Sequence, residues 1–128
     1  MDLGDILTKE QIITDLQAAD RWQAIDELIN NLVSTGKIKS ENHASTDLIN
    51  EVVGALGRSK KGVNFDALDN QPVNLVMLFL VPQGQFQKHL HTLANIAKLL
   101  HKAEFRQALE QAPNAEAMLK IIRDHGKR

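Results

Sequence analysis

The feature that most constrains the fold is a run of nine nearly continuous apolar residues, Val73–Val81, which stops at Pro82 and Gly84. A strand with one face in water alternates apolar and polar side chains, whereas a strand covered on both faces is apolar throughout. The run therefore predicts a central strand in a sheet with helices on both faces. We expect an α/β fold, a three-layer sandwich whose mixed sheet has about four to five strands and carries the site at one edge.

Apolar residues at helical spacing predict a helix over Arg21–Ser34, with Asp20 as its N-cap and Gly36 as the stop signal after it. The polar segment 37–50 shows no sustained period. The other expected elements are strands near residues 12–16 and over 52–58, a turn over 59–62, and helices over 86–101 (continuing irregularly through 104–110) and over 114–124.

The length and composition indicate one ordinary domain over residues 1–128. Fifteen Lys and Arg oppose sixteen Asp and Glu, which is not the charge balance of a typical nucleic-acid-binding protein. The absence of cysteine excludes disulfides, thiolate metal sites and a cysteine nucleophile. Because the sequence has no membrane-spanning apolar run and no basic signal-peptide start, we expect a cytoplasmic protein without membrane or nucleic-acid partners.

Three cations lie at or beside the expected turn, at Arg58, Lys60 and Lys61. They fit either a phosphate- or nucleic-acid-binding patch or an ordinary solvated turn, and we favour the turn because such charge runs are commonplace on surfaces.

Five histidines in a chain without cysteine are candidates for metal or phosphoryl chemistry. His89 and His91 form a His-x-His pair, but two residues advance about 200° around a helix, so the two rings point in nearly opposite directions and cannot share an ion. His89 falls on the apolar stripe of its helix and His91 faces water. From the residues alone, His89 is either a buried core histidine or a site residue, and His43 is either an idle loop histidine or a site residue. His101 and His125 are expected on the surface.

Several motifs in order resemble one family. Residues 65–75 read Phe-Asp-Ala-Leu-Asp-Asn-Gln-Pro-Val-Asn-Leu, residues 80–82 read Leu-Val-Pro, and residues 89–93 read His-Leu-His-Thr-Leu. This sequence resembles the enzyme IIA domain of the fructose/mannitol class of the bacterial phosphoenolpyruvate-dependent phosphotransferase system, and most closely its nitrogen-regulatory branch. The resemblance is strong over residues 43–123 and looser over residues 7–36.

The resemblance implies a phosphocarrier. A neutral histidine accepts a phosphoryl group from the phosphohistidine of HPr or a similar carrier protein, so no metal or organic cofactor is implied. His43 matches the acceptor, because it precedes the Phe-Asp-Ala-Leu-Asp motif at about the family's spacing. His89 matches the second histidine, which contacts the phosphoryl group. Because of this match, we interpret His89 as a site residue rather than as a core histidine.

The sequence departs from the family immediately before His43. There the family has a helix, an Arg-Glu segment, a glycine-rich loop and Ile-Pro, whereas this chain has Lys-Ser-Glu-Asn at residues 39–42. Roughly 20 to 25 residues are absent relative to the family. Either the sequence omits a segment that the protein contains, or the protein lacks it. We favour the first explanation, because glycine-rich loops beside phosphoryl sites are often mobile.

Three functional alternatives remain open. The resemblance implies either a regulatory module that chooses partner proteins by its phosphorylation state or a sugar-transport component that passes the group to an enzyme IIB domain. We favour the nitrogen-regulatory role. The third alternative is an interaction domain that is never phosphorylated, in which His43 is idle.

Overall fold

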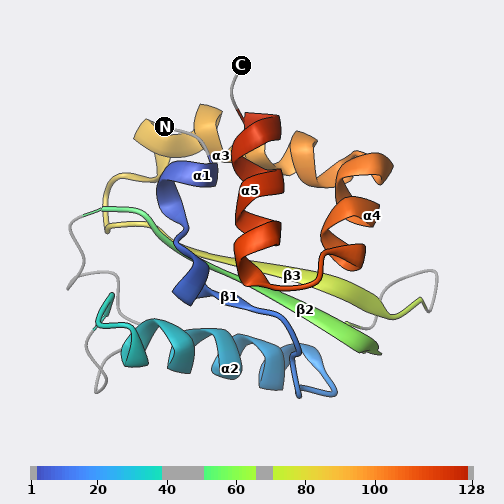
Figure 1. The fold of residues 1–128 in the computed structure, drawn as a ribbon. Helices are drawn as coiled ribbons and strands as arrows, with labels where there is room; N and C mark the ends of the chain where they lie inside the picture. The colour runs from blue at the N-terminus through green and yellow to red at the C-terminus, as the bar shows by residue number, and fades with distance from the viewer. Residues whose placement is uncertain (1–2, 39–50, 66–70, 127–128) are drawn as a thin grey trace.

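The computed structural model describes residues 3–38, 51–65 and 71–126 (Figure 1). Along the chain its elements are α1 (Leu3–Ile6), a 3-10 turn (Lys9–Gln11), β1 (Ile12–Ile13), α2 (Arg21–Ser34), β2 (Val53–Val63), β3 (Val73–Leu80), α3 (Phe86–His101), α4 (Ala103–Gln111) and α5 (Ala115–Gly126).

The helix predictions are largely confirmed. The bounds of α2 are those expected, and the carboxylate of Asp20 caps the helix by accepting the backbone N–H of Gln23 at 2.9 Å. The irregular continuation expected after His101 is a separate helix, α4, because Lys102 has extended backbone angles that break the helical path. Within the described residues, no helix is both long and apolar enough to cross a membrane.

The sheet is mixed, as predicted, but its described part has three strands rather than four to five. β1 runs parallel to β2, and β2 runs antiparallel to β3. β1 has only two residues. The chain then leaves the ladder, although the N–H of Leu16 still donates to the carbonyl of Arg58 at 2.8 Å.

The expected turn over residues 59–62 is wrong, because β2 continues through it to Val63. The pairing of β2 with β3 shifts between Arg58 and Val63, so the extra residues form a bulge. Gly62 has a φ of 90°, and its N–H donates to the Ser59 hydroxyl at 2.9 Å. Asn74 on β3 donates its side-chain N–H to the Ser59 carbonyl at 2.8 Å. The residues expected to form a turn thus form a bulge inside a strand.

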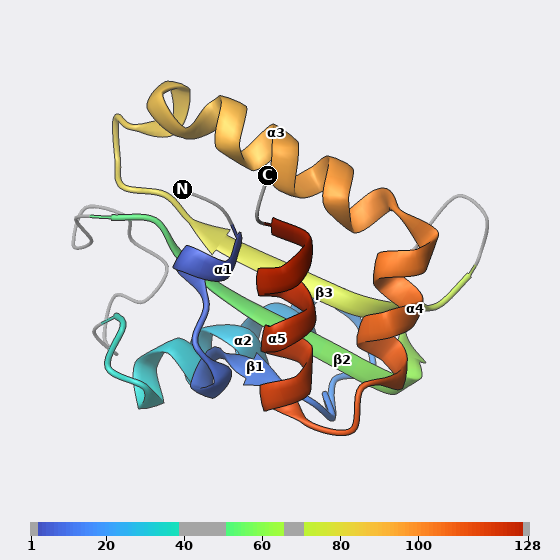
Figure 2. The same ribbon diagram turned by 45° about the horizontal axis from the view of Figure 1, so that its top comes forward.

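Helices cover both faces of the sheet, which confirms the expected three layers (Figures 1 and 2). On one face, Leu28 and Leu32 of α2 pack with Ala55 of β2 in one hydrophobic cluster. On the other face, side chains from α3, α4 and α5 form a second cluster with Leu56 of β2. Successive residues of a strand point to opposite faces, so adjacent residues of β2 enter the two cores.

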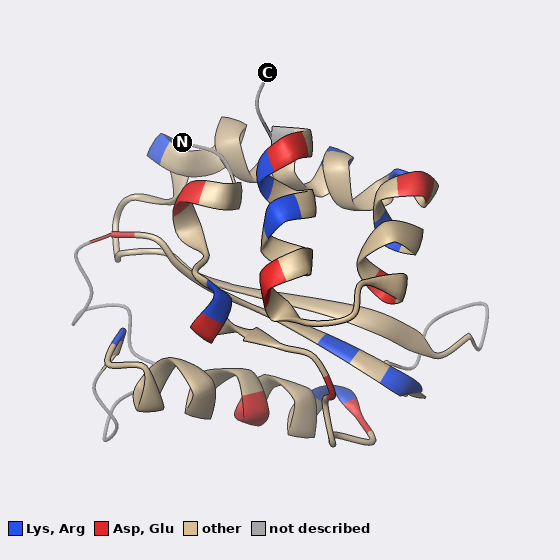
Figure 3. Cartoon of the chain, viewed as in Figure 1, with Lys and Arg blue, Asp and Glu red and all other residues tan. Residues whose placement is uncertain are grey.

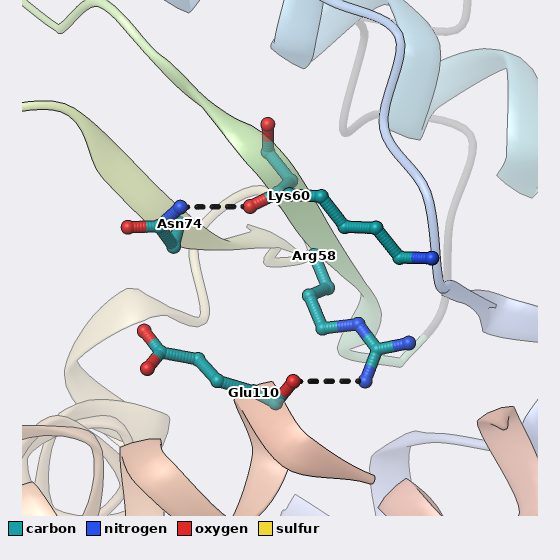
Figure 4. A pocket seen from close by; sticks show the side chains of 5 residues that line it. Arg58, Lys60, Asn74 and Glu110 are labelled. Atoms are coloured by element: carbon teal, nitrogen blue, oxygen red, sulfur yellow. Dashed lines mark hydrogen bonds between the residues drawn. The ribbon is translucent and has the colours of Figure 1, made fainter. Parts of the chain in front are cut away.

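The guanidinium of Arg58 is buried, with 5% of the residue exposed, so the expectation that it lies on a solvated turn is wrong. Its Nε donates to the carbonyl of Thr14 at 3.1 Å, and one terminal nitrogen donates to carbonyls at the end of α4 (Figure 4). These acceptors are Leu109 at 3.0 Å, Glu110 at 3.5 Å and Ala112 at 2.6 Å. The last carbonyls of a helix have no partner within the helix, and Arg58 supplies donors to them.

Lys60 and Lys61 are exposed, as expected for a solvated stretch. Basic positions lie together on one end of β2, and the helices carry both acidic and basic positions (Figure 3). Lys60 lines an open cavity of about 310 Å³ together with Arg58, Ser59, Asn74 and Glu110. Because Arg58 is committed to backbone carbonyls, this cavity does not present its guanidinium as a free anion-binding group.

We predict that Arg58→Met destabilises the fold by about 3 kcal/mol, because it leaves several buried carbonyls without donors. Lys60→Met is the matched control: it removes an exposed cation two residues away and should change the free energy of unfolding by less than about 0.5 kcal/mol. Denaturant unfolding measures both variants. Equal stability of the two variants would show that Arg58 is not needed to hold α4 on the sheet.

Candidate functional site

His89 lies in the first turn of α3 and is buried, with 9% of the residue exposed. His91 is exposed, so the prediction that the two rings lie on opposite sides of the helix is confirmed. The Nε2 of His89 lies 3.4 Å from Oε1 of Gln85. No motif in the sequence singles out Gln85, although it stands four residues before His89, the spacing at which helical side chains meet.

The start of α3 lies at the end of the sheet where β2 begins. Val53, the first residue of β2, pairs with Leu80, the last residue of β3, and α3 follows β3 after residues 81–85 (Figures 1 and 2). His43 precedes Val53 by ten residues but lies outside the described residues. The topology therefore brings the strand that follows His43 to the same end of the sheet as His89. That the two rings meet stays a prediction.

The surface beside His89 is partly apolar. Phe86 and Leu90, four residues apart on one side of α3, are 58% and 48% exposed. Lys88 adds a positive charge in the same turn. The first turn of α3 therefore carries exposed apolar and basic groups around the buried ring of His89.

The two described ends that flank residues 39–50 approach one another. Lys37, after α2, and Glu51, before β2, line a single cavity of about 150 Å³. Buried Gln11 lines it too, and its amide donates to the carbonyls of Ile6 at 3.2 Å and Gly54 at 2.7 Å.

The described residues contain no group of three His, Asp or Glu side chains placed to hold a metal ion. The chemistry at this end of the sheet is that of an imidazole, an amide and nearby exposed apolar groups.

Comparison with protein families identifies the chain. Residues 42–125 match the model of the family described as "Phosphoenolpyruvate-dependent sugar phosphotransferase system, EIIA 2". The chain belongs to this EIIA 2 family. The resemblance drawn from the sequence motifs is thus confirmed, and the relatives named below include nitrogen regulatory proteins.

Two curated relatives show the range of the EIIA 2 family around this chain. A "Nitrogen regulatory protein" of Bradyrhizobium diazoefficiens is 31% identical, and the match covers 95% of each chain. The "PTS system fructose-specific EIIABC component" of Bacillus subtilis is 28% identical over 99% of this chain, which spans only 24% of that relative's length.

Two solved structures have the same fold. The nitrogen regulatory protein IIA-Ntr from Neisseria meningitidis matches with a TM-score of 0.78 at 24% identity, covering 94% of this chain and 98% of that one. A complex of enzyme IIAMTL and phosphorylated enzyme IIBMTL from Escherichia coli matches with a TM-score of 0.73 at 15% identity, covering 92% of this chain and 97% of that one. A solved EIIA complex thus contains a IIB partner.

We predict that diethyl pyrocarbonate modifies His89 at least several-fold more slowly than His91, because the reagent must reach a ring nitrogen and His89 is 9% exposed whereas His91 is an exposed residue. Fragment-ion mass spectrometry over the reaction time distinguishes the two residues within one peptide. Equal rates would contradict the burial of His89.

Proposed function

We propose that this EIIA 2 chain is a phosphocarrier in which His43 accepts a phosphoryl group from a phosphorylated HPr-like carrier protein. A nitrogen lone pair of the neutral His43 ring attacks the phosphorus. The new N–P bond forms as the N–P bond to the carrier's histidine breaks, and that carrier nitrogen keeps the electron pair. A histidine with an ordinary pKa near 6.5 is largely neutral at pH 7, as this attack requires.

The observation that carries the proposal is the burial of His89 at the end of the sheet where the strand after His43 begins. Burying a polar ring on an otherwise apolar helix face costs free energy unless the ring makes compensating hydrogen bonds. In this proposal the His89 ring makes such a hydrogen bond by donating to the phosphoryl oxygens. Hydrogen-bond donors and positive charge held around the phosphoryl oxygens are the main means by which proteins stabilise a transferring phosphoryl group.

A nitrogen-regulatory role is supported by the Bradyrhizobium relative, which this chain matches over 95% of both lengths. In this role the phosphoryl group changes the charge of the surface near Phe86 and Leu90 and so selects a regulatory partner. The second candidate is transfer to an enzyme IIB domain, which the fructose-specific relative and the IIAMTL–IIBMTL complex favour.

One observation supports residues missing relative to the family, and a second supports their place before His43. The match to the Bacillus relative extends over 151 positions, more than the 128 residues of this chain, so some positions have no counterpart here. The family match begins at residue 42. If the protein itself lacks these residues, it also lacks the donors that they would place around the phosphoryl group, and transfer is impaired.

The test is phosphorylation of the purified protein by phosphoenolpyruvate, enzyme I and carrier protein, followed by gel autoradiography. We expect His43→Ala to abolish the acid-labile label and His89→Ala to slow labelling about 100-fold, the scale of one lost transition-state donor. His91→Ala is the matched control on the same helix and should label at the wild-type rate.

Unchanged labelling of His43→Ala would exclude this residue as the acceptor. If the wild type takes up no label and His43→Ala binds carrier protein and regulatory partners as the wild type does, the non-phosphorylated interaction domain is the remaining interpretation. The intact mass of the starting protein separates the two explanations of the gap: a mass above 14.3 kDa by the weight of the absent segment shows that the segment is present.

A further inference from the structure

We propose that Gln85 is a positioning residue for His89: its amide oxygen accepts the Nε2–H of the ring, which fixes the ring's orientation and leaves Nδ1 as the atom that contacts the phosphoryl group. The phosphoryl part of this statement rests on the proposed function. The ring orientation does not, and it can be measured independently.

Gln85 occupies the N-cap position of α3 without capping the helix. Effective N-caps are short side chains whose oxygen accepts a backbone N–H of the first turn, and glutamine is not one of them. Here the side chain makes no such bond, and its Oε1 lies 3.4 Å from Nε2 of His89. Among the described residues, this side-chain amide therefore contacts His89 rather than the backbone of the first helical turn.

The backbone holds Gln85 in place for this contact. Its N–H donates to the carbonyl of Pro82 at 3.0 Å, and its carbonyl accepts the N–H of His89 at 3.3 Å. The residue is half-buried. The backbone of Gln85 is therefore hydrogen-bonded on both sides of its Cα, which places the start of its side chain beside His89.

The orientation of the Gln85 amide indicates which ring nitrogen of His89 donates. In the structure the oxygen of the Gln85 amide faces the ring, and an amide oxygen only accepts, so this orientation of the amide assigns the proton to Nε2 of His89. No other hydrogen bond to this ring is found among the described residues, which leaves Nδ1 for a ligand. When the phosphoryl dianion arrives, Nδ1 takes a proton from solvent and donates it in a hydrogen bond, while Gln85 continues to hold Nε2–H. Without Gln85 the ring can rotate and exchange its two nitrogens.

The experiment is long-range proton–nitrogen NMR of the histidine rings at pH 8, above the ordinary histidine pKa of about 6.5. We expect wild-type His89 to show a proton on Nε2 that exchanges slowly with water, and Gln85→Leu to lose that signal and average the two tautomers. Gln85→Glu keeps an acceptor at the same position and should keep the signal. Gln87→Leu, the same change at an exposed position of the same helix turn, is the control.

The backbone amide spectrum confirms that each variant is folded, and phosphorylation rates are measured on the same samples. We expect Gln85→Leu to be phosphorylated about 2- to 10-fold more slowly than the wild type, the effect of one lost hydrogen bond, and Gln87→Leu at the wild-type rate. A wild-type ring signature in Gln85→Leu, or a neutral wild-type ring protonated on Nδ1, would overturn the positioning role. A wild type that accepts no phosphoryl group while its ring still responds to Gln85→Leu would overturn the proposed function and the phosphoryl contact, but not the ring orientation.

Discussion

The layered structure depends most on the hydrogen bonds that the guanidinium of Arg58 donates to backbone carbonyls. This charged group is buried, and within the described part of the chain no carboxylate pairs with it. Its hydrogen-bond partners are backbone carbonyls from two separate parts of the chain. One is the segment that leaves β1, and the other is the C-terminal end of α4. A buried cation is tolerated only when its donors are satisfied, so the sheet and the helical layer must keep this relative position.

The fixed position of the helical layer on the sheet also determines where the first turn of α3, and with it His89, lies. α3 follows directly from the end of β3, and α4 follows α3 after Lys102. The α3–α4 pair is therefore fixed to the sheet at both ends, by β3 at its beginning and by Arg58 at its end. His89 lies in the first turn of this pair, so the fold rather than a mobile loop determines the position of its backbone.

Local signals in the sequence predicted the helices well, because a cap such as Asp20 and a period of apolar residues act within one or two turns of chain. The β2 bulge was missed because Ser59 and Gly62 have the chemistry of a turn in either setting. Asn74, on another strand, contacts Ser59 within the bulge, and no local pattern reveals that contact. Arg58 was assigned to the surface for the same reason, since its acceptors lie 44 to 54 residues away.

The candidate site divides in the same way. The burial of His89 follows from its angle on the helix, and its functional interpretation came from the family motifs. Gln85 became visible only when the structure showed an N-cap side chain directed at the ring. Fragmentation mass spectrometry of the phosphorylated protein, under conditions that preserve phosphohistidine, locates the phosphoryl group. We expect it on His43 and on none of the other four histidines. A phosphoryl group on His89 or any other residue, with His43 unmodified, would contradict the assignment of His43 as the acceptor.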